Sequence, residues 1–270
     1  MALCFFDLTA DNLKDFVADA FAHRGLWVFH HIPKTAGSSL GGEMALHAAP
    51  YHNILPDYAD HDTPFHTRLD RAVTTVLDRA RAGAAHPDGP LRSASGHVLS
   101  SHLRRISTEV PETRFFTFLR NPLARIVSEY TYNRSPKHPP HQDFRRAYPT
   151  LADFARDPAE HNKMAFFMFE NNRVALPDAL AEMGKRYAMI GLQERYPVSF
   201  LLLSSMIWGP ALPKMRERVS EKSDMPELTD DLRRTIFASN TLDMEICAAV
   251  ERVYNRIAPA VWANLRPEPA

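Results

Sequence analysis

The sequence predicts a single α/β domain in which a central parallel sheet is flanked by helices. Two apolar runs, at residues 26–32 and 114–119, have the length and composition of buried parallel strands. A segment with helical features follows each run, and strands that alternate with helices are typical of a parallel sheet. The 270 residues suit one large domain of this class, so we expect one domain over residues 1–270.

The first expected elements are a helix, a strand and a second helix. Apolar residues recur at helical spacing over residues 9–24, and Gly25 is a natural end for that helix. The strand at 26–32 ends before Pro33, and the segment from Ser38 onward again has helical character. The loop PKTAG is therefore expected to join a strand to a helix.

The next part of the chain predicts a loop, a helix and a weaker strand. Residues 50–65 are rich in Pro, Asp and His and are expected to form a loop. Apolar positions at helical spacing predict a helix over residues 66–82. A strand is expected at residues 93–99.

A second strand–helix unit follows. After the strand at 114–119, Asn121 and Pro122 form a favourable N-cap and first-turn pair for a helix that continues to Tyr132. Residues 134–149 have many prolines and no periodicity, so they are expected to form an irregular loop that could cover a site.

The C-terminal half, residues 150–258, is expected to be mostly helical. Thr150 and Asp153 resemble a capping box that starts helices over about residues 151–185. A further strand is expected at 187–192, where the sequence reads YAMIGL.

The composition excludes several classes of protein. Hydrophobic residues at 45% and charged residues at 24% are ordinary globular values, which excludes disordered, collagen-like and coiled-coil chains. The 32 Lys and Arg residues balance 32 Asp and Glu residues, and a zero net charge argues against a nucleic-acid-binding protein. Cys4 and Cys247 cannot form a disulfide framework.

The same reading gives an expectation for the location of the protein. No run approaches the roughly 18 apolar residues of a membrane span. The N-terminus has charged residues where a signal peptide needs an apolar run. We therefore expect a cytoplasmic protein without a transmembrane segment, and leave open an anchor on a longer precursor.

The segment PKTAGSS has the features of a phosphate-binding loop. The N-terminus of a helix offers free backbone N–H groups and a partial positive charge, so an anion binds there favourably. Lys34 adds a full charge, and the hydroxyls of Ser38 and Ser39 can donate to phosphate oxygens. The ATPase motif G-x-x-x-x-G-K-[ST] is not present at this loop.

A second anion-binding pair is expected after the strand at 114–119. Arg120 lies at its carboxyl end, where ligands bind in open α/β sheets. Ser128 follows eight residues later, in the expected helix. Arg binds phosphate in a bidentate manner and Ser adds a donor, so the two segments together indicate a nucleotide with two separated phosphates.

Both motifs resemble those of the sulfotransferases that use 3′-phosphoadenosine-5′-phosphosulfate (PAPS). FHHIPKTAGSSL is similar to the family's 5′-phosphosulfate loop, and FTFLRNPLARIVSEY to its 3′-phosphate motif. The likeness is greatest to the carbohydrate branch that contains heparan-sulfate 2-O-sulfotransferase, whose loop reads P-K-T-G-G-[ST]-[ST]. Ala36 replaces the first of those glycines, and we expect the loop to stay intact. Softer similarities, including SGHVLSSHL, extend the resemblance to residues 26–257.

The resemblance implies a fold, a donor and a set of donor-binding residues. The fold would be the P-loop-NTPase-like sulfotransferase fold, with a nucleotide-binding core at about residues 26–135. PAPS would donate the sulfuryl group, 3′-phosphoadenosine-5′-phosphate (PAP) would be the product, and no metal would be required. The residues implied are Lys34, Thr35, Ala36, Gly37, Ser38 and Ser39 at the 5′-phosphate, Arg120 and Ser128 at the 3′-phosphate, and Lys214 and Arg216, with Arg218, from a basic C-terminal segment.

The resemblance also implies two catalytic residues. Lys34 would stabilise the charge on the leaving oxygen, and His97 matches the position of the catalytic His in the 2-O-sulfotransferase branch. A His near its ordinary pKa is well suited to deprotonate a hydroxyl. Other candidate bases are His30, His31, Glu43 and His102. Of His30 and His31, at most one should face the site, because neighbouring strand residues alternate in direction.

The acceptor is expected to be a small molecule or a glycan, with no nucleic-acid partner, and the oligomeric state is left open. The charges Arg134, Lys137, Arg145 and Arg146 are interpreted as exposed surface rather than as ligands of an anionic acceptor. Two alternatives to a sulfotransferase remain. An ATP-dependent small-molecule kinase is disfavoured by the missing G-K-[ST], and a non-catalytic nucleotide-binding module by the presence of Lys34 and His97.

Overall fold

Five parallel strands form the central sheet of the computed structural model, which describes residues 3–214 and 226–267. The strand order is β2-β3-β1-β4-β5, with β1 in the centre. The predicted α/β class is therefore confirmed. The strands are β1 (Leu26–His30), β2 (Tyr51–Ile54), β3 (Ser93–Gly96), β4 (Thr113–Leu119) and β5 (Tyr187–Leu192).

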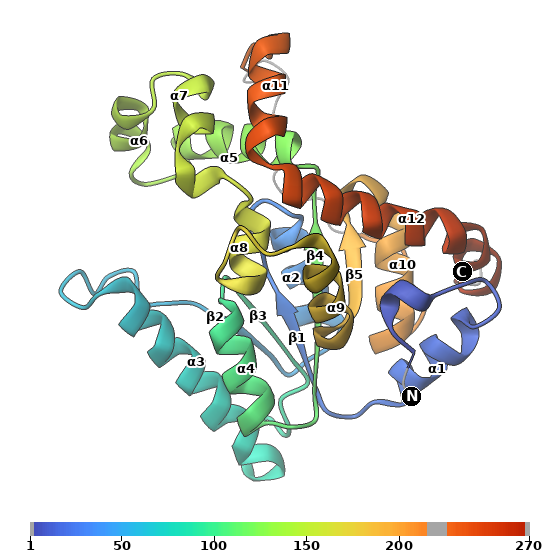
Figure 1. Cartoon of the computed structure of the whole chain (residues 1–270). Helices are drawn as coiled ribbons and strands as arrows, with labels where there is room; N and C mark the ends of the chain where they lie inside the picture. Colours follow the sequence, from blue (N-terminus) through green and yellow to red (C-terminus); the bar gives the residue numbers. More distant parts are fainter. Residues whose placement is uncertain (1–2, 215–225, 268–270) are drawn as a thin grey trace.

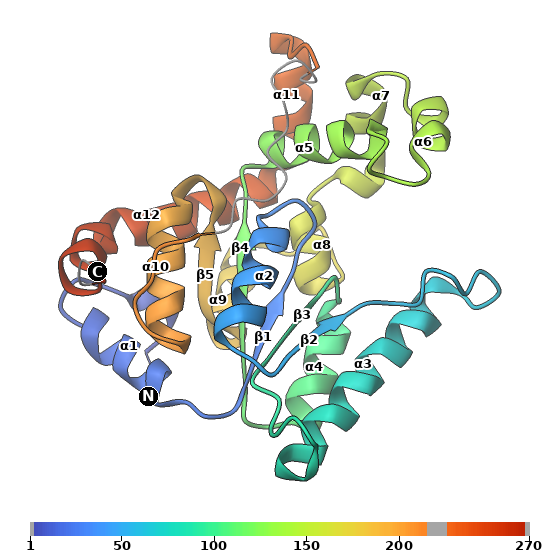
Figure 2. The same ribbon diagram turned by 180° about the vertical axis from the view of Figure 1, so that it is seen from behind.

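Helices cover both faces of the sheet (Figures 1 and 2). In Figure 1, α4, α8 and α9 lie in front of the strands, whereas α2 and α10 come to the front in Figure 2. Among the described residues, no helix combines the length and apolar character needed to cross a membrane. The α-helices are α1 (Leu13–Ala22), α2 (Gly37–His47), α3 (Phe65–Ala82), α4 (Ser100–Glu109), α5 (Pro122–Arg134), α6 (His141–Ala147), α7 (Leu151–Arg156), α8 (Lys163–Phe169), α9 (Leu176–Arg186), α10 (Tyr196–Ile207), α11 (Asp230–Ser239) and α12 (Thr241–Asn264).

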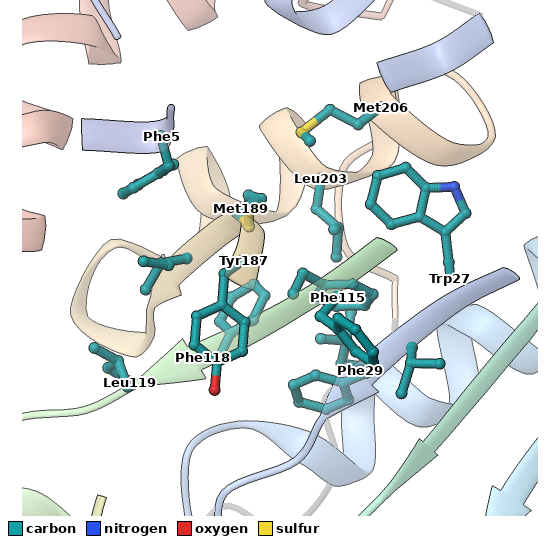
Figure 3. Packing of buried hydrophobic residues seen from close by; sticks show 14 of the residues in the cluster. Phe5, Trp27, Phe29, Phe115, Phe118, Leu119, Tyr187, Met189, Leu203 and Met206 are labelled. Atoms are coloured by element: carbon teal, nitrogen blue, oxygen red, sulfur yellow. The ribbon is translucent and has the colours of Figure 1, made fainter. Parts of the chain in front are cut away.

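The main core extends over both faces of the sheet and includes many residues of α10. Every residue of β1 is buried, which explains its unbroken apolar run: both faces of a central parallel strand are covered by helices. The rings of Phe29 on β1 and Phe116 on β4 stack with centroids 5.2 Å apart. Figure 3 shows Leu203 and Met206 of α10 packed over these strands. Burying a side chain of this size stabilises a fold by about 1.5–3 kcal/mol.

Two predictions about loops are wrong. Residues 51–54 form the edge strand β2, which pairs in parallel with β3, although residues 50–65 were expected to be a loop. The edge strand β2 is largely exposed or half-buried, so it lacks the continuous apolar run of a buried strand. The expected loop at 134–149 contains the short helix α6, which packs on α5 through Phe144 and Tyr130, with ring centroids 6.0 Å apart.

A small helical lobe stands beyond the carboxyl ends of the strands (Figure 1). It consists of α5, α6, α7 and α11, which share a second apolar core around Ile126, Phe154 and Ile236. The helix after β1, α2, lies on one face of the sheet, and the helix after the neighbouring strand β3, α4, lies on the other, so the chain leaves these two strands toward opposite faces. In open α/β sheets the ligand crevice lies at such a switch point, outside the carboxyl ends of the strands.

Candidate functional site

A cavity of about 350 Å³ lies at the carboxyl ends of the central strands. The loop after β1 lines one side of it, and His97 and Arg120, which follow β3 and β4, line the next. Helix α5 of the helical lobe closes the remaining side with Ser128 and Tyr132. The cavity thus joins both predicted phosphate motifs.

The loop after β1 leads directly into the N-terminus of α2. Ser38 and Ser39 lie in the first turn of α2 and line the cavity, so their hydroxyls and the free N–H groups of that turn are close together. Thr35 is buried, and its hydroxyl donates to the carbonyl oxygen of Ile32 over 2.8 Å. The Thr35 side chain therefore stabilises the loop itself rather than lining the cavity.

Gly37 is needed because the loop packs against a histidine. A Cβ atom placed on Gly37 would lie 1.6 Å from Nε2 of His31. The His31 ring in turn stacks on Phe29, with centroids 5.2 Å apart. Any side chain at position 37 would displace His31 from the wall of the cavity.

Ala36 has a backbone conformation that glycine adopts more readily. Its φ is +79° and it is the N-cap of α2. A non-glycine residue in the left-handed region costs about 1–2 kcal/mol. The positive φ at this position explains why the similar loop P-K-T-G-G has a glycine there. Ala36 adopts the same loop geometry at an energetic cost.

Replacing Ala36 with Gly is expected to increase the free energy of unfolding by about 1 kcal/mol, because the strain at φ +79° is removed. Chemical denaturation measures this change. The matched control is Ala45→Gly, in the same helix but exposed and within its helical part. That variant should lose about 0.5–1 kcal/mol, and equal effects of the two variants would contradict the argument.

Arg120 links the two predicted phosphate motifs. It follows β4, and its Nη1 donates to the carbonyl oxygen of Lys34 over 3.2 Å. The chain then turns into α5, where the side chain of Asn121 accepts from the backbone N–H of Ala124 over 3.3 Å, as expected of an N-cap. Ser128 lies two turns further on and lines the same cavity.

The ammonium group of Lys34 lies over an aromatic ring. Its Nζ is 4.0 Å from the ring centroid of Tyr132, which is a cation–π contact. Tyr132 is four residues after Ser128 on α5, so both side chains lie on the same face of that helix. The sequence reading missed Tyr132, although its helical spacing from Ser128 was available.

His97 is held in one tautomer by a backbone carbonyl. Its Nδ1 lies 2.7 Å from the carbonyl oxygen of His31. Because a carbonyl only accepts, Nδ1 carries the proton, and the lone pair of the neutral ring is at Nε2. Burial lowers the pKa of His97, although the His31 carbonyl and Glu129 act in the opposite direction. The lowered pKa favours the neutral form of His97, which is the form in which a base acts.

The other candidate bases differ in their access to the cavity. His30 is fully buried between the hydroxyl of Tyr187 and the carbonyl of Val98, and burial lowers its pKa to about 3. His31 lines the cavity, 4.0 Å from the His97 ring between centroids. The alternation expected of neighbouring strand residues thus places His31, and not His30, at the cavity wall.

Glu43 and His102 have structural partners outside the cavity lining. Glu43 is buried in α2, where it accepts from the backbone N–H of Lys214 over 2.7 Å. His102 accepts from the backbone N–H of Leu99 over 3.0 Å and contacts Asp70 over 3.1 Å, which stabilises the start of α4.

Four charged side chains form a buried network beside the cavity. Arg125 is fully buried and pairs with Glu129 and Glu160, and Lys163 pairs with the same two carboxylates. Glu129 also lines the cavity. Burial, followed by the proximity of Glu129, raises the pKa of Glu160. The sequence reading missed this network, which connects α5 to the start of α8.

Several remaining predictions concern peripheral residues. Lys214 is described but does not line the cavity, and Arg216 and Arg218 lie outside the described residues.

In residues 3–214 and 226–267, no group of three or more His, Cys, Asp or Glu side chains could hold a metal ion. The lining residues that the sequence reading missed, besides Tyr132 and Glu129, are Tyr58, Asn133, His138 and Gln193.

Comparison with known proteins agrees with this geometry. A family model described as "Sulfotransferase family" matches residues 21–255, which include the loop after β1, His97, Arg120 and α5. No curated protein matches the chain significantly. Because the family match covers most of the chain, the protein belongs to the sulfotransferase family, whose members transfer sulfuryl groups.

Proposed function

We propose that the protein transfers a sulfuryl group from PAPS to a hydroxyl group of a carbohydrate. The observation that carries this proposal is the hydrogen bond from Arg120 to the carbonyl oxygen of Lys34, because it joins the two anion-binding segments in one cavity. A donor with a 3′-phosphate and a 5′-phosphosulfate presents two separated anionic groups that match these segments.

The residues of the cavity suit the donor. The N–H groups at the start of α2, with Ser38 and Ser39, offer donors for the 5′-phosphate. Arg120 and Ser128 offer a guanidinium and a hydroxyl for the 3′-phosphate. The Arg120 guanidinium has five N–H donors, so it can keep its hydrogen bond to the carbonyl oxygen of Lys34 while it binds a phosphate.

In the proposed reaction, His97 and Lys34 have separate roles. PAPS supplies the electrophilic sulfur: the acceptor oxygen forms the new S–O bond as the bond to the bridging oxygen of the leaving PAP breaks. Nε2 of His97 accepts the proton of the acceptor hydroxyl, and the His31 carbonyl keeps that nitrogen unprotonated beforehand. The Lys34 ammonium stabilises the negative charge that develops on the leaving oxygen.

Thermal denaturation with three nucleotides tests the proposed donor. PAP is expected to stabilise the protein more than AMP, which lacks the 3′-phosphate, and more than ATP with magnesium. Arg120→Ala should abolish the preference for PAP over AMP, whereas the control Arg173→Ala, at an exposed arginine, should retain it. Stabilisation by ATP with magnesium alone would overturn the proposal in favour of a kinase.

A further inference from the structure

The cavity has a second group of residues besides those proposed to bind the donor. Tyr58, Asn133 and His138 line it, together with His31 and His97. Tyr58 comes from the loop between β2 and α3, and the other two residues come from the end of α5 and the segment after it. This group, which we name the acceptor wall, consists of aromatic, amide and imidazole side chains.

The acceptor wall has little net charge. Lys34 and Arg120 are the cations among the described residues that line the cavity, and both belong to the proposed donor site. The carboxylate of Glu129 is neutralised by its contacts with Arg125 and Lys163.

Two imidazoles of the wall, those of His97 and His138, have lowered pKa values, which favours their neutral forms. Burial lowers the pKa of His97. Burial, with the nearby His141 and Lys34, also lowers the pKa of His138. Among the residues that the structure describes, the acceptor wall therefore has no lysine or arginine side chain that would bind a carboxylate or a sulfate group of an acceptor.

The basic residues after α5 are used within the helical lobe. Arg134 donates to the carbonyl oxygens of Tyr148 and Pro149, over 3.2 and 3.1 Å. Arg145 donates to the carbonyl oxygen of Arg134 over 2.8 Å, and Arg146 pairs with Asp143. Lys137 is exposed and is the exception. These contacts support the interpretation of the segment as ordinary surface charge.

The loop between β2 and α3, which supplies Tyr58, is rich in negatively charged residues. The residues around it include Asp57, Asp60 and Asp62, of which Asp60 pairs with Arg71 over 3.4 Å. The loop runs outward between β2 and α3 (Figure 1). An anionic acceptor in contact with Tyr58 would lie near these carboxylates, and like-charge contacts disfavour binding.

Tyr58 itself offers an aromatic surface to a ligand. Tyr58 is 59% exposed, so its ring is accessible to a ligand in the cavity that it lines. An aromatic ring binds the apolar face of a sugar, and the Asn133 amide and the His138 imidazole can bond to hydroxyl groups. A simple phenol has one hydroxyl and would leave most of these polar groups unused.

We propose that the acceptor is an uncharged saccharide whose ring lies on Tyr58, and not a polyanionic glycan of the glycosaminoglycan type. The inference rests on the proposed function, since it names the substrate of the same site. It also separates this chain from the heparan-sulfate-like branch that its motifs resemble.

Binding of paired sugars to the PAP-saturated protein tests the inference. Methyl hexosides and the matching methyl hexuronides differ only in a CH₂OH group against a carboxylate. We expect at least one hexoside to bind about tenfold or more tightly than its hexuronide, and to be sulfated with a correspondingly higher kcat/KM. Calorimetry measures the binding, and labelled PAPS measures the transfer.

Variants at Tyr58 provide the matched comparison. Tyr58→Ala should weaken hexoside binding about tenfold, because the sugar ring loses the aromatic surface on which it lies. Tyr58→Phe keeps the aromatic ring and should keep the affinity. PAP affinity should be equal in all three proteins. Tighter binding of hexuronides, no effect of Tyr58→Ala, or no binding of any hexoside would overturn the inference. If PAP itself does not bind, the proposed function fails instead.

Discussion

Replacing Lys34 with Ala is expected to reduce the rate of sulfuryl transfer by about a thousandfold while the protein remains folded. The ammonium group is the cation at the loop after β1, and it lies 4.0 Å over the Tyr132 ring. A positive charge that is already positioned where negative charge develops stabilises the transition state more than the ground state. The loss should therefore lie mainly in kcat.

Two measurements and one control separate this effect from a loss of folding or binding. Steady-state transfer from labelled PAPS gives kcat, and calorimetric titration with PAP gives the affinity for the product. The affinity should fall by no more than about tenfold, since several other groups are proposed to bind the 5′-phosphate. Lys137→Ala removes an exposed lysine from the segment after α5 and should leave both quantities unchanged. A Lys34→Ala variant with near-normal kcat would refute the proposed role.

Replacing His97 with Gln is expected to reduce kcat by about 100- to 10,000-fold, the usual contribution of a general base. Gln retains a side chain that can donate to the His31 carbonyl, so the cavity wall should stay in place. PAP affinity should not change, because His97 is not among the proposed donor-binding residues. The control His66→Gln alters an exposed histidine of α3 and should have no effect.

The pH dependence gives a second readout for His97. A base acts in its deprotonated form, so activity is present above its pKa and is lost as the pH falls through that pKa. Because burial lowers the pKa of His97 in the free protein, the acid limb of kcat/KM, which reports the free enzyme, should lie below 6.5, the ordinary value for histidine. The limb should be absent from the residual activity of His97→Gln. An unchanged limb in that variant would assign the base to another group.

The sequence predicted the strands that are mostly buried, including the edge strand β5, and missed the half-exposed edge strand β2. The strands β1, β4 and β5 are buried on both faces, so their apolar runs were visible without any tertiary information. The edge strand β2 depends on pairing with β3, and the short helix α6 depends on packing against α5. Such elements are stabilised by partners distant in sequence, which a local pattern does not reveal.

The candidate site also contains residues that local motifs identified and residues that only the fold brings together. The loop after β1, Arg120 and Ser128 were identified as candidates because phosphate binding requires particular residues at particular points of a strand–helix unit. Tyr58 reaches the cavity from a loop that has no motif, and Glu129 becomes part of a network only when Lys163 of α8 is brought beside it. Contacts between separate elements are set by the fold and not by local spacing.

The buried network of Arg125, Glu129, Glu160 and Lys163 limits how this sequence can evolve. Two cations and two anions neutralise one another there, and removal of one partner from a buried pair costs about 3–5 kcal/mol. Such a loss is a large fraction of the stability of an ordinary domain. A single substitution at one of these four positions is therefore destabilising. We expect the four residues to change together during evolution rather than one at a time. Substitutions in α5 of the helical lobe and at the start of α8 are thereby coupled, although the residues concerned lie up to 38 positions apart in the chain.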